Sequence, residues 1–137
     1  MAILVDTNAL YALVDDAEPQ HQAVYQFVDR TEQALLVPIT VLPELDYLVF
    51  TRLGPRIQIR VLRSLLGGEF QIETPTAQDL ERAVELAEQY AGSGLGLVDA
   101  SIAAIAERLN IRQILTLDRR DFGMLRPRHC SAFELVP

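Results

Sequence analysis

Four acidic residues of this chain are placed where their side chains could do chemistry together. Asp6 directly follows a short apolar run, and Asp118 follows the apolar run 114–115 after Thr116 and Leu117. Glu44 and Asp99 lie near the starts of two apolar helical segments, so burial is expected for all four. Ionised carboxylates that share a buried site repel one another and hold protons unless a cation compensates them. The pattern therefore predicts an oxygen-ligand site for a hard cation, Mg²⁺ or Mn²⁺.

Each acid also has an ordinary structural interpretation. Asp6 can cap a helix, Asp99 can interact with a helix dipole in the first turn, and Asp118 can form a turn. Taken singly, these interpretations remain open. Taken together, the acids favour a shared site, because ligands of open α/β sheets bind outside the carboxyl ends of the strands.

The elements that must position these acids follow from the apolar pattern. Short apolar runs without polar alternation predict strands that are buried on both faces. The predicted strands cover residues 3–5, 35–37, 70–72 and 114–115, with an edge strand over 133–136. Helical periodicity marks the segments between them, around 7–14, 24–28, 45–49, 56–66, 80–87 and 98–109. This alternation predicts an α/β fold with a parallel sheet between helical layers.

Three of the helical segments carry further signals. Thr40 is expected to cap its helix, with Pro43 in the first turn, where a missing N–H does least harm. Thr76 is expected to cap a helix whose buried stripe is Leu80, Ala83, Val84 and Ala87. The segment 98–109 is so apolar that it should lie inside the molecule.

Composition narrows the class of protein. The chain has 137 residues, half of them hydrophobic and 23% charged, which predicts a single globular domain over residues 1–137. All twelve basic residues are arginine, so Walker-type P-loop and Schiff-base chemistry are excluded. The only cysteine, Cys130, allows no internal disulfide. No apolar run approaches a membrane span and the N-terminus has no basic region, so we expect a soluble cytoplasmic protein.

Four segments in order resemble the PIN-domain ribonucleases, and most closely the VapC-type toxins of toxin–antitoxin pairs. These segments are Val5-Asp6-Thr7-Asn8, Pro43-Glu44-Leu45, Leu97-Val98-Asp99-Ala100 and Leu115-Thr116-Leu117-Asp118-Arg119-Arg120-Asp121-Phe122. The resemblance covers essentially the whole chain. It implies a three-layer α/β/α fold with a short-stranded, mainly parallel central sheet.

The resemblance also implies residue roles. Asp6, Glu44, Asp99 and Asp118 would bind the divalent metal and form the catalytic site. Thr116 matches a hydroxyl that supports the site, and Asn8 matches an amide that helps to orient the first aspartate. Asp121 is a further supporting acid at a position that varies within the family.

The implied function is a Mg²⁺- or Mn²⁺-dependent endoribonuclease that cleaves RNA phosphodiester bonds, with tRNA or ribosomal RNA as substrate class. Carboxylate-held metal can supply both an activated water and charge neutralisation, so no histidine or lysine base is required. A small cognate antitoxin is the implied partner. We expect it to insert a basic side chain among the acids and to lie in an apolar groove through an amphipathic flanking segment. A homodimer is also implied, and the segment 47–50 could serve either that contact or the core.

Arginine placement adds candidate RNA contacts. Arg119 and Arg120 directly follow Asp118 and are the main candidates, and Arg126 and Arg128 extend this cluster. Earlier in the chain, Arg56, Arg60 and Arg63 share one helical face, which is either a track for RNA phosphates or a solvated surface. His21, His129 and Cys130 occur in no motif, so we assign them no step in catalysis.

Two other function classes share some of these features. A haloacid-dehalogenase-type phosphatase or a receiver domain also places an aspartate after the first strand, but both rely on a lysine, and this chain has none. A non-catalytic interaction domain with the PIN fold is the second alternative. Retention of all four acids argues against it, because unpaired buried charges are costly. The net charge of −7 argues against indiscriminate nucleic-acid binding but leaves local patches free to bind.

Overall fold

A five-stranded parallel sheet forms the centre of the computed structural model, which describes residues 1–137. The strands are β1 (Ala2–Val5), β2 (Ala34–Pro38), β3 (Gln71–Glu73), β4 (Gln113–Leu115) and β5 (Glu134–Val136). Their order across the sheet is β3-β2-β1-β4-β5, and every neighbouring pair is parallel. The central strand β1 is fully buried from Ile3 to Val5, as its unbroken apolar run predicts.

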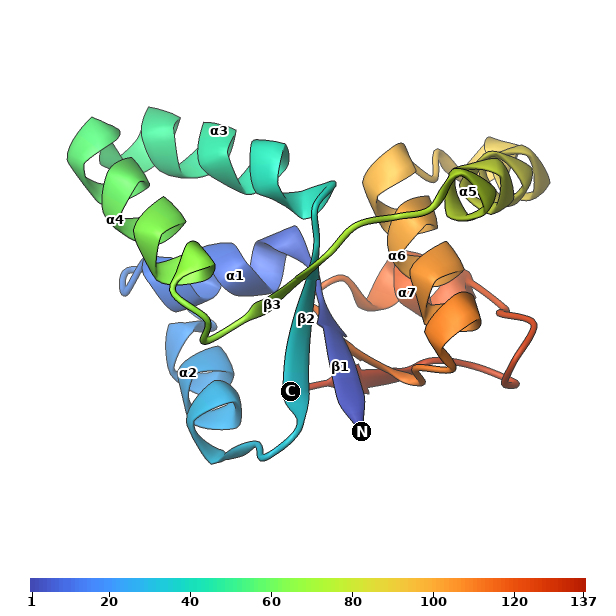
Figure 1. Cartoon of the computed structure of the whole chain (residues 1–137), viewed down its shortest axis with the longest axis horizontal. Coiled ribbons are helices and arrows are strands. Elements are labelled where there is room, and N and C mark those ends of the chain that lie inside the picture. The colour runs from blue at the N-terminus through green and yellow to red at the C-terminus, as the bar shows by residue number, and fades with distance from the viewer.

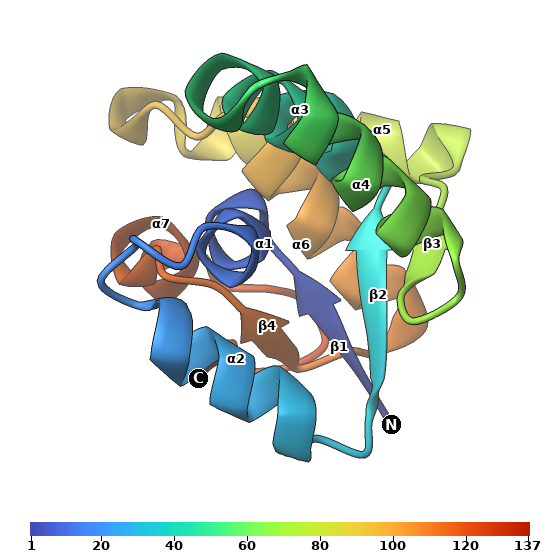
Figure 2. The ribbon, with the colours of Figure 1, turned by 90° about the vertical axis from the view of Figure 1, so that its left-hand side faces the viewer.

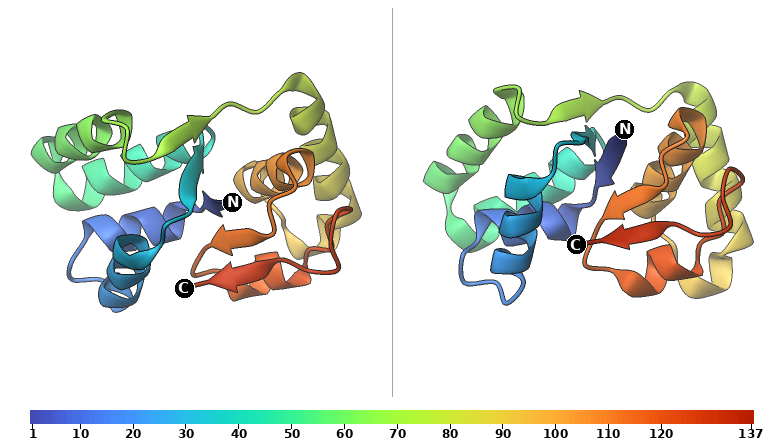
Figure 3. Two further views of the ribbon diagram at one scale, coloured as in Figure 1. Left: turned by 60° about the horizontal axis from the view of Figure 1, so that its bottom comes forward. Right: turned by 90° about the horizontal axis from the view of Figure 1, so that it is seen from below.

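Helices cover both faces of the sheet and complete three layers (Figures 1 and 2). One layer contains α1 (Thr7–Val14), α2 (His21–Arg30), α3 (Val41–Leu53) and α4 (Pro55–Leu66). The other contains α5 (Ala77–Gln89), α6 (Leu97–Leu109) and α7 (Arg119–Met124), with a short 3₁₀ turn at Ala91–Ser93. The view from below separates the two helical layers on either side of the strands (Figure 3). The α/β/α prediction is therefore confirmed, and the sheet is parallel throughout.

The core consists of thirty buried residues contributed by the sheet and by the inner faces of the helices. Helix α6 is its innermost helix, because every residue from Ala100 to Ala106 is buried. This confirms the interior position expected for the apolar segment 98–109. Complete burial of each Leu, Ile or Val side chain contributes about 1.5–3 kcal/mol. None of the helices is long and apolar enough to cross a membrane.

Helix α5 departs from its predicted buried stripe. Ala83 and Leu86 lie in the core, whereas the side chains of Leu80 and Val84 are 41% and 54% exposed. The reason is that α5 packs mainly against α6 rather than on the sheet, so only a narrow face of it is covered. The start of α5 is as predicted, since Thr76 accepts from the Asp79 amide and Asp79 accepts from the Thr76 amide.

Arginine–carboxylate pairs hold α5 against α6 and β3. Arg82 on α5 donates through Nε and Nη2 to both oxygens of Glu107 on α6, at 2.7 and 3.1 Å. Arg108 donates through Nε to both oxygens of Asp79, at 3.1 and 2.9 Å, and through Nη2 to Glu73 on β3. We refer to these five residues as the ion-pair network. The bidentate contact of Arg82 with Glu107 is the strong form of the guanidinium–carboxylate contact.

The connections at helix starts explain two other boundaries. Gly54 lies between α3 and α4 with φ of +90°, a conformation that side chains disfavour, and Pro55 then begins α4. Thr40 precedes α3 as predicted, and Pro43 is in the first turn. The Thr40 side chain, however, makes no capping hydrogen bond. Its hydroxyl is instead bonded to Ser101 on α6, a contact that no local pattern could reveal.

Candidate metal centre

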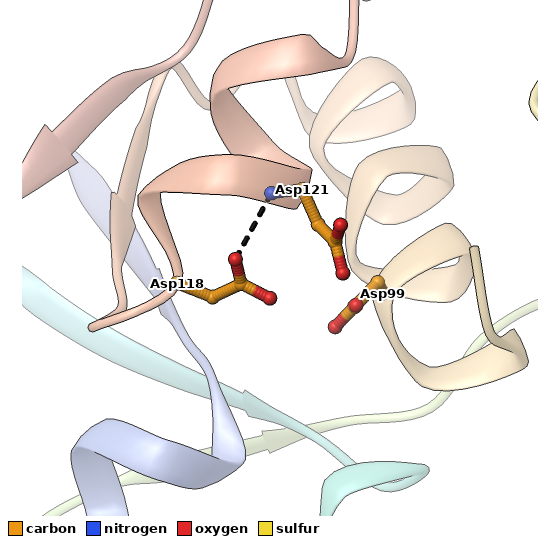
Figure 4. A group of neighbouring side chains, drawn as sticks. All are labelled: Asp99, Asp118 and Asp121. Carbon is orange, nitrogen blue, oxygen red and sulfur yellow. Dashed lines mark hydrogen bonds between the residues drawn. The ribbon is translucent and has the colours of Figure 1, made fainter. Parts of the chain in front are cut away.

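Three aspartates converge where β4 and α6 meet the start of α7. Asp99 is in the first turn of α6, Asp118 is the N-cap of α7, and Asp121 is in the first turn of α7. Each offers a carboxylate oxygen, and these three oxygens lie within 4.8 Å of one another (Figure 4). Two of the four predicted ligands, Asp99 and Asp118, thus come together with Asp121, the acid expected to support them.

Asp6 occupies the end of β1, at the same carboxyl edge of the sheet. It is the N-cap of α1 and only 4% exposed. Its Oδ1 accepts a hydrogen bond from the Thr7 amide, and its Oδ2 accepts from the Thr116 hydroxyl, both at 2.8 Å. Both oxygens are therefore oriented by donors from the chain. Neither of these donors is a cation.

Asn8 and Thr116 tie the ends of β1 and β4 together. The Asn8 side-chain oxygen accepts from the Leu117 amide at 2.9 Å. The Thr116 oxygen, which donates to Asp6, also accepts from the Asp118 amide at 3.0 Å. Oδ1 of Asp118 in turn accepts from the Asp121 amide at 2.9 Å, which fixes the start of α7. The two residues expected to support the site therefore lie where they can do so.

Glu44 differs from its expectation of burial. It lies in the first turn of α3 but is exposed, because the buried face of that helix is formed by Val41, Leu45 and Val49. Its negative charge is close enough to raise the pKa of both Asp6 and Asp99. Glu44 thus borders the aspartates rather than sharing their enclosure.

Burial and mutual repulsion dominate the electrostatics of the cluster, and the charge of Arg120 opposes them only at Asp121. Burial, followed by the charges of Asp6, Asp118, Asp121 and Glu44, raises the pKa of Asp99 to about 7. Burial raises the pKa of Asp6 to about 6, although its two hydrogen bonds lower it. Burial and the neighbouring Asp118 also raise the pKa of Asp121. Perturbed acids gathered at one edge of a sheet are typical of a functional site.

None of these five acids forms a salt bridge, which leaves the cluster suited to an added cation. The pairs present in the structure join Arg82, Arg108 and Arg128 to other carboxylates. Oδ1 of Asp121 is buried and has no hydrogen-bond partner, and the same holds for the Thr7 hydroxyl oxygen. A donor set made only of carboxylate and hydroxyl oxygens matches the preference of Mg²⁺ and Mn²⁺. The residues present therefore fit a divalent cation.

The arginines near the cluster fall into two groups. Arg119 and Arg120 are exposed; Arg119 makes one long contact, 3.4 Å to the Pro137 carbonyl. Arg126, in contrast, donates to the Gly123 carbonyl at the end of α7, and Arg128 pairs with Glu85 on α5. Both side chains are nevertheless exposed, so their grouping with substrate contacts stays a prediction.

Other residues singled out in the sequence lie away from the cluster. Arg56, Arg60 and Arg63 are exposed on one face of α4 and form no ion pair, so their role stays a prediction. Nδ1 of His21 is 2.7 Å from the Ala12 carbonyl, and Nε2 of His129 is 2.6 Å from the Ile111 carbonyl. Both histidines are thus engaged by the backbone.

Comparison with known proteins identifies relatives of this chain. Residues 3–125 match the family described as the PIN domain. The chain is 41% identical over 135 residues to ribonuclease VapC26 of Mycobacterium tuberculosis, an alignment that covers 98% of this chain and all of the relative. The residues matched by the PIN family, 3–125, include every acid of the cluster.

Solved structures share the fold at lower identity. VapC20 of Mycobacterium tuberculosis, described as a sarcin-ricin loop cleaving toxin, superimposes with a TM-score of 0.84 at 22% identity and covers 94% of this chain and 98% of its own. VapBC2 of Rickettsia felis, solved bound to a DNA fragment from its promoter, gives a TM-score of 0.73 at 19% identity with full coverage of both chains. The VapBC complex of Salmonella typhimurium, also DNA-bound, gives 0.70 at 18% identity and covers 98% of both chains.

Proposed function

This chain belongs to the PIN-domain family, and on that premise we propose that it is a metal-dependent endoribonuclease and the toxin of a toxin–antitoxin pair. The observation that carries the proposal is the group of five acids at the carboxyl edge of the sheet, none of which forms a salt bridge. The 41% identity to a ribonuclease supports the assignment of this cluster to RNA cleavage. The substrate is RNA of the tRNA or ribosomal RNA class.

Asp99, Asp118 and Asp6 would hold the divalent cation, with Glu44 and Asp121 completing the negative surround. Such a cation supplies activation of water and neutralisation of charge on the scissile phosphate. The chain's own residues preorganise the acids. Thr116 and the Thr7 amide orient both oxygens of Asp6, and the Asp121 amide orients Asp118. Preorganised groups need no rearrangement during the reaction. Much of an enzyme's rate enhancement arises from such preorganisation.

The experiment that tests this function measures RNA cleavage by the purified chain with Mn²⁺ or Mg²⁺ and with EDTA. We expect cleavage only with metal. We also expect Mn²⁺ at a hundred times its Kd to stabilise the fold by about 2.7 kcal/mol, seen as a rise in Tm. A chain that neither cleaves RNA nor gains Tm with metal would instead be a non-catalytic interaction domain.

The antitoxin of this proposal would lie in an apolar groove beside α1. The groove has a volume of about 630 Å³ and is lined mainly by hydrophobic side chains of α1, α2 and α4, among them Leu10, Leu13, Val28, Ile57 and Val61. Its shape and lining suit the apolar face of one amphipathic helix. Asp6 caps the N-terminus of α1, and Leu10 and Leu13 of the same helix line the groove. A bound segment could therefore extend to the acids and place an arginine or lysine among them.

This partner proposal predicts competition and a groove-specific defect. Excess Mn²⁺ should weaken the complex with the co-purified antitoxin, because metal and the basic side chain need the same carboxylates. Ile57→Asp on α4 should abolish the complex yet keep RNA cleavage. Leu80→Asp is the matched control, since Leu80 is exposed on the distant helix α5. A complex that persists in Ile57→Asp would place the antitoxin elsewhere.

A homodimer is the remaining part of the proposal. On α3, Val49 is buried in the core, whereas Tyr47 and Phe50 are 67% and 49% exposed. Two exposed aromatic side chains one turn apart suit a contact with a second copy of the chain. Light scattering should give twice the chain mass for the wild type and a monomer for Tyr47→Arg. A monomeric wild type would contradict this assembly.

A further inference from the structure

A chain of hydroxyl groups connects the start of α3 to the first turn of α6. The Ser101 hydroxyl donates to the Val98 carbonyl at 2.7 Å. The hydroxyl oxygens of Thr40 and Ser101 are also 2.7 Å apart. Because the single hydroxyl hydrogen of Ser101 is committed to Val98, Thr40 must be the donor to Ser101. Ser101 is fully buried, so water does not compete for this contact.

The Thr40 hydroxyl makes this contact instead of capping α3. A threonine before a helix ordinarily adopts an extended backbone and accepts from an amide of the first turn, as Thr76 does before α5 with ψ of 167°. Thr40 has helical backbone angles, φ −64° and ψ −22°, and no capping bond. The first turn of α3 therefore lacks the side-chain acceptor that a capping threonine supplies. The hydroxyl is used instead on a residue 61 positions away.

The two ends of the hydroxyl chain lie next to metal-site residues. Val98 precedes Asp99, and Thr40 lies one helical turn before Glu44. The starts of α3 and α6 lie on either side of the carboxyl end of β2 (Figure 1). No other hydrogen bond or salt bridge joins residues 40–53 to residues 97–109. The polar link between these two helices therefore depends on a single pair of hydroxyl groups.

Glu44 and Asp99 need such a link more than the other acids do. Asp6 and Asp118 accept hydrogen bonds that orient their carboxylates directly. No amide or hydroxyl of the chain donates to Glu44 or Asp99, and the only polar side-chain partner of Asp99 is the carboxyl of Asp121. Their positions therefore depend mainly on where α3 and α6 begin. A displacement of one helix start relative to the other changes the separation of these two charges.

We propose that Thr40 and Ser101 are positioning residues that set Glu44 relative to Asp99 and thereby determine the affinity of the site for a divalent cation. This inference rests on the proposed function, because it requires that Glu44 and Asp99 belong to a metal site. Groups that orient metal ligands commonly change metal affinity 10- to 100-fold when they are removed. The pair acts only through the helices, so we expect the lower end of that range, about tenfold.

The experiment is a calorimetric titration of the metal-free chain with Mn²⁺, which reports binding without cleavage. Ser101→Ala and Thr40→Val each remove one hydroxyl with little change in volume. Each should raise the Mn²⁺ Kd by about tenfold. The double variant should bind as weakly as either single variant, because both break the same hydroxyl chain. Thr40→Ser, which keeps the hydroxyl, should bind Mn²⁺ as the wild type does.

Thr51→Val is the matched control on the same helix. The Thr51 hydroxyl donates only to carbonyls of α3 itself, those of Tyr47 and Leu48. Its removal should leave the Mn²⁺ Kd unchanged. The inference is overturned if Ser101→Ala lowers the Tm while its Mn²⁺ Kd equals that of the wild type, since the pair then only stabilises the fold. A wild-type chain that binds no Mn²⁺ overturns the proposed function and this inference with it.

Discussion

Asp6 and Asp79 are equally buried, each 4% exposed, but their carboxylates have different kinds of partner. Asp79 accepts a bifurcated hydrogen bond from Nε of Arg108 and a hydrogen bond from the amide of Thr76. Asp6 receives a hydroxyl and an amide but no cation. Burial alone therefore does not separate a structural carboxylate from a functional one. What differs between Asp6 and Asp79 is whether the chain itself supplies a positive partner.

The same contrast holds for the regions around them. In the ion-pair network, burial by itself would raise the pKa of Glu107, but Arg82 and the Arg128 amide hold that pKa below its ordinary value. In the acid cluster, burial and like charges raise the pKa of Asp99 to about 7. A network with its own cations is complete as folded. A cluster without them repels itself until a proton or a metal ion arrives.

Asp99→Asn should have the largest effect, which is a loss of RNA cleavage. Loss of this carboxylate should lower RNA cleavage by about three orders of magnitude, because metal-derived charge stabilisation is worth several kcal/mol. The metal-free variant should keep the Tm of the wild type or exceed it, since one of several repelling charges is gone. Cleavage assays and thermal unfolding in EDTA measure the two effects.

Two further variants test the same cluster. Asp118→Asn and Glu44→Gln should also abolish cleavage while the protein stays folded. A folded Asp99→Asn variant with near wild-type cleavage would contradict the assignment of the cluster. A strongly destabilised Asp99→Asn variant would contradict the contrast with the ion-pair network.

In the network, removal of one partner should cost stability rather than activity. Arg82→Met keeps an apolar stem but leaves Glu107, whose side chain is 10% exposed, without its guanidinium. We expect the free energy of unfolding to fall by about 2–3 kcal/mol, less than for a fully enclosed pair. Urea denaturation measures this loss. Arg82→Met combined with Glu107→Gln should recover part of it, because no charge is then left unpaired.

The pH dependence of stability gives a third and smaller distinction. The carboxyls of Asp99 and Asp6 have an ordinary pKa of 3.8 and are raised to about 7 and about 6 in the fold. At pH values between the ordinary pKa and the raised pKa of each carboxyl, the folded chain binds more protons than the unfolded chain. The free energy of unfolding therefore falls as pH rises. From pH 5 to 8 in EDTA we expect a loss of about 2 kcal/mol after allowance for solvent screening.

The control for this pH effect is Asp99→Asn, which should show a shallower decline over the same range. Saturating Mn²⁺ should also remove the decline above pH 7, because the cation then stabilises the ionised acids. A metal-free wild type whose stability rises from pH 5 to 8 would contradict the raised pKa of both carboxyls.

The smallest expected effect concerns the arginines that have no carboxylate partner. Arg119 and Arg120 stand free beside the cluster, whereas Arg128 is paired with Glu85. Replacement of Arg119 and Arg120 by Gln should reduce the log–log salt slope of RNA binding by about 0.7 for each phosphate that the variant no longer neutralises. Arg128→Gln should leave the slope unchanged. Equal slopes in all three proteins would assign Arg119 and Arg120 to solvent.

Much of the fold and part of the site could be predicted from local sequence. An unbroken apolar run predicts a buried strand, and an acid shortly after it lies at the carboxyl edge of a parallel sheet. Asp6 directly follows β1, and Asp118 comes three residues after the end of β4. Asp99 followed from a helix that is apolar on all sides. In each of these cases the informative residues lie within one element, so short-range pattern is sufficient.

The features that escaped prediction depend on contacts between distant elements. Glu44 is exposed because the packing of α3 selects another face. Leu80 is exposed because α5 packs on a helix and not on the sheet. The hydroxyl of Thr40 meets Ser101, and Arg128 meets Glu85, across 61 and 43 positions. The residues near either partner in the sequence do not predict such a long-range contact.

The hydrogen bond between Asp6 and Thr116 joins residues 110 positions apart, and this has a consequence for biosynthesis. At about 5–20 residues per second, a growing chain carries Asp6 for roughly 5–20 s before Thr116 and Asp118 are made. Until then the β1 end of the site lacks its hydroxyl donor and a predicted metal ligand. A nascent chain, or one that terminates before Thr116, therefore carries an incomplete acid cluster. An aborted translation product of this gene should be harmless to the cell that makes it.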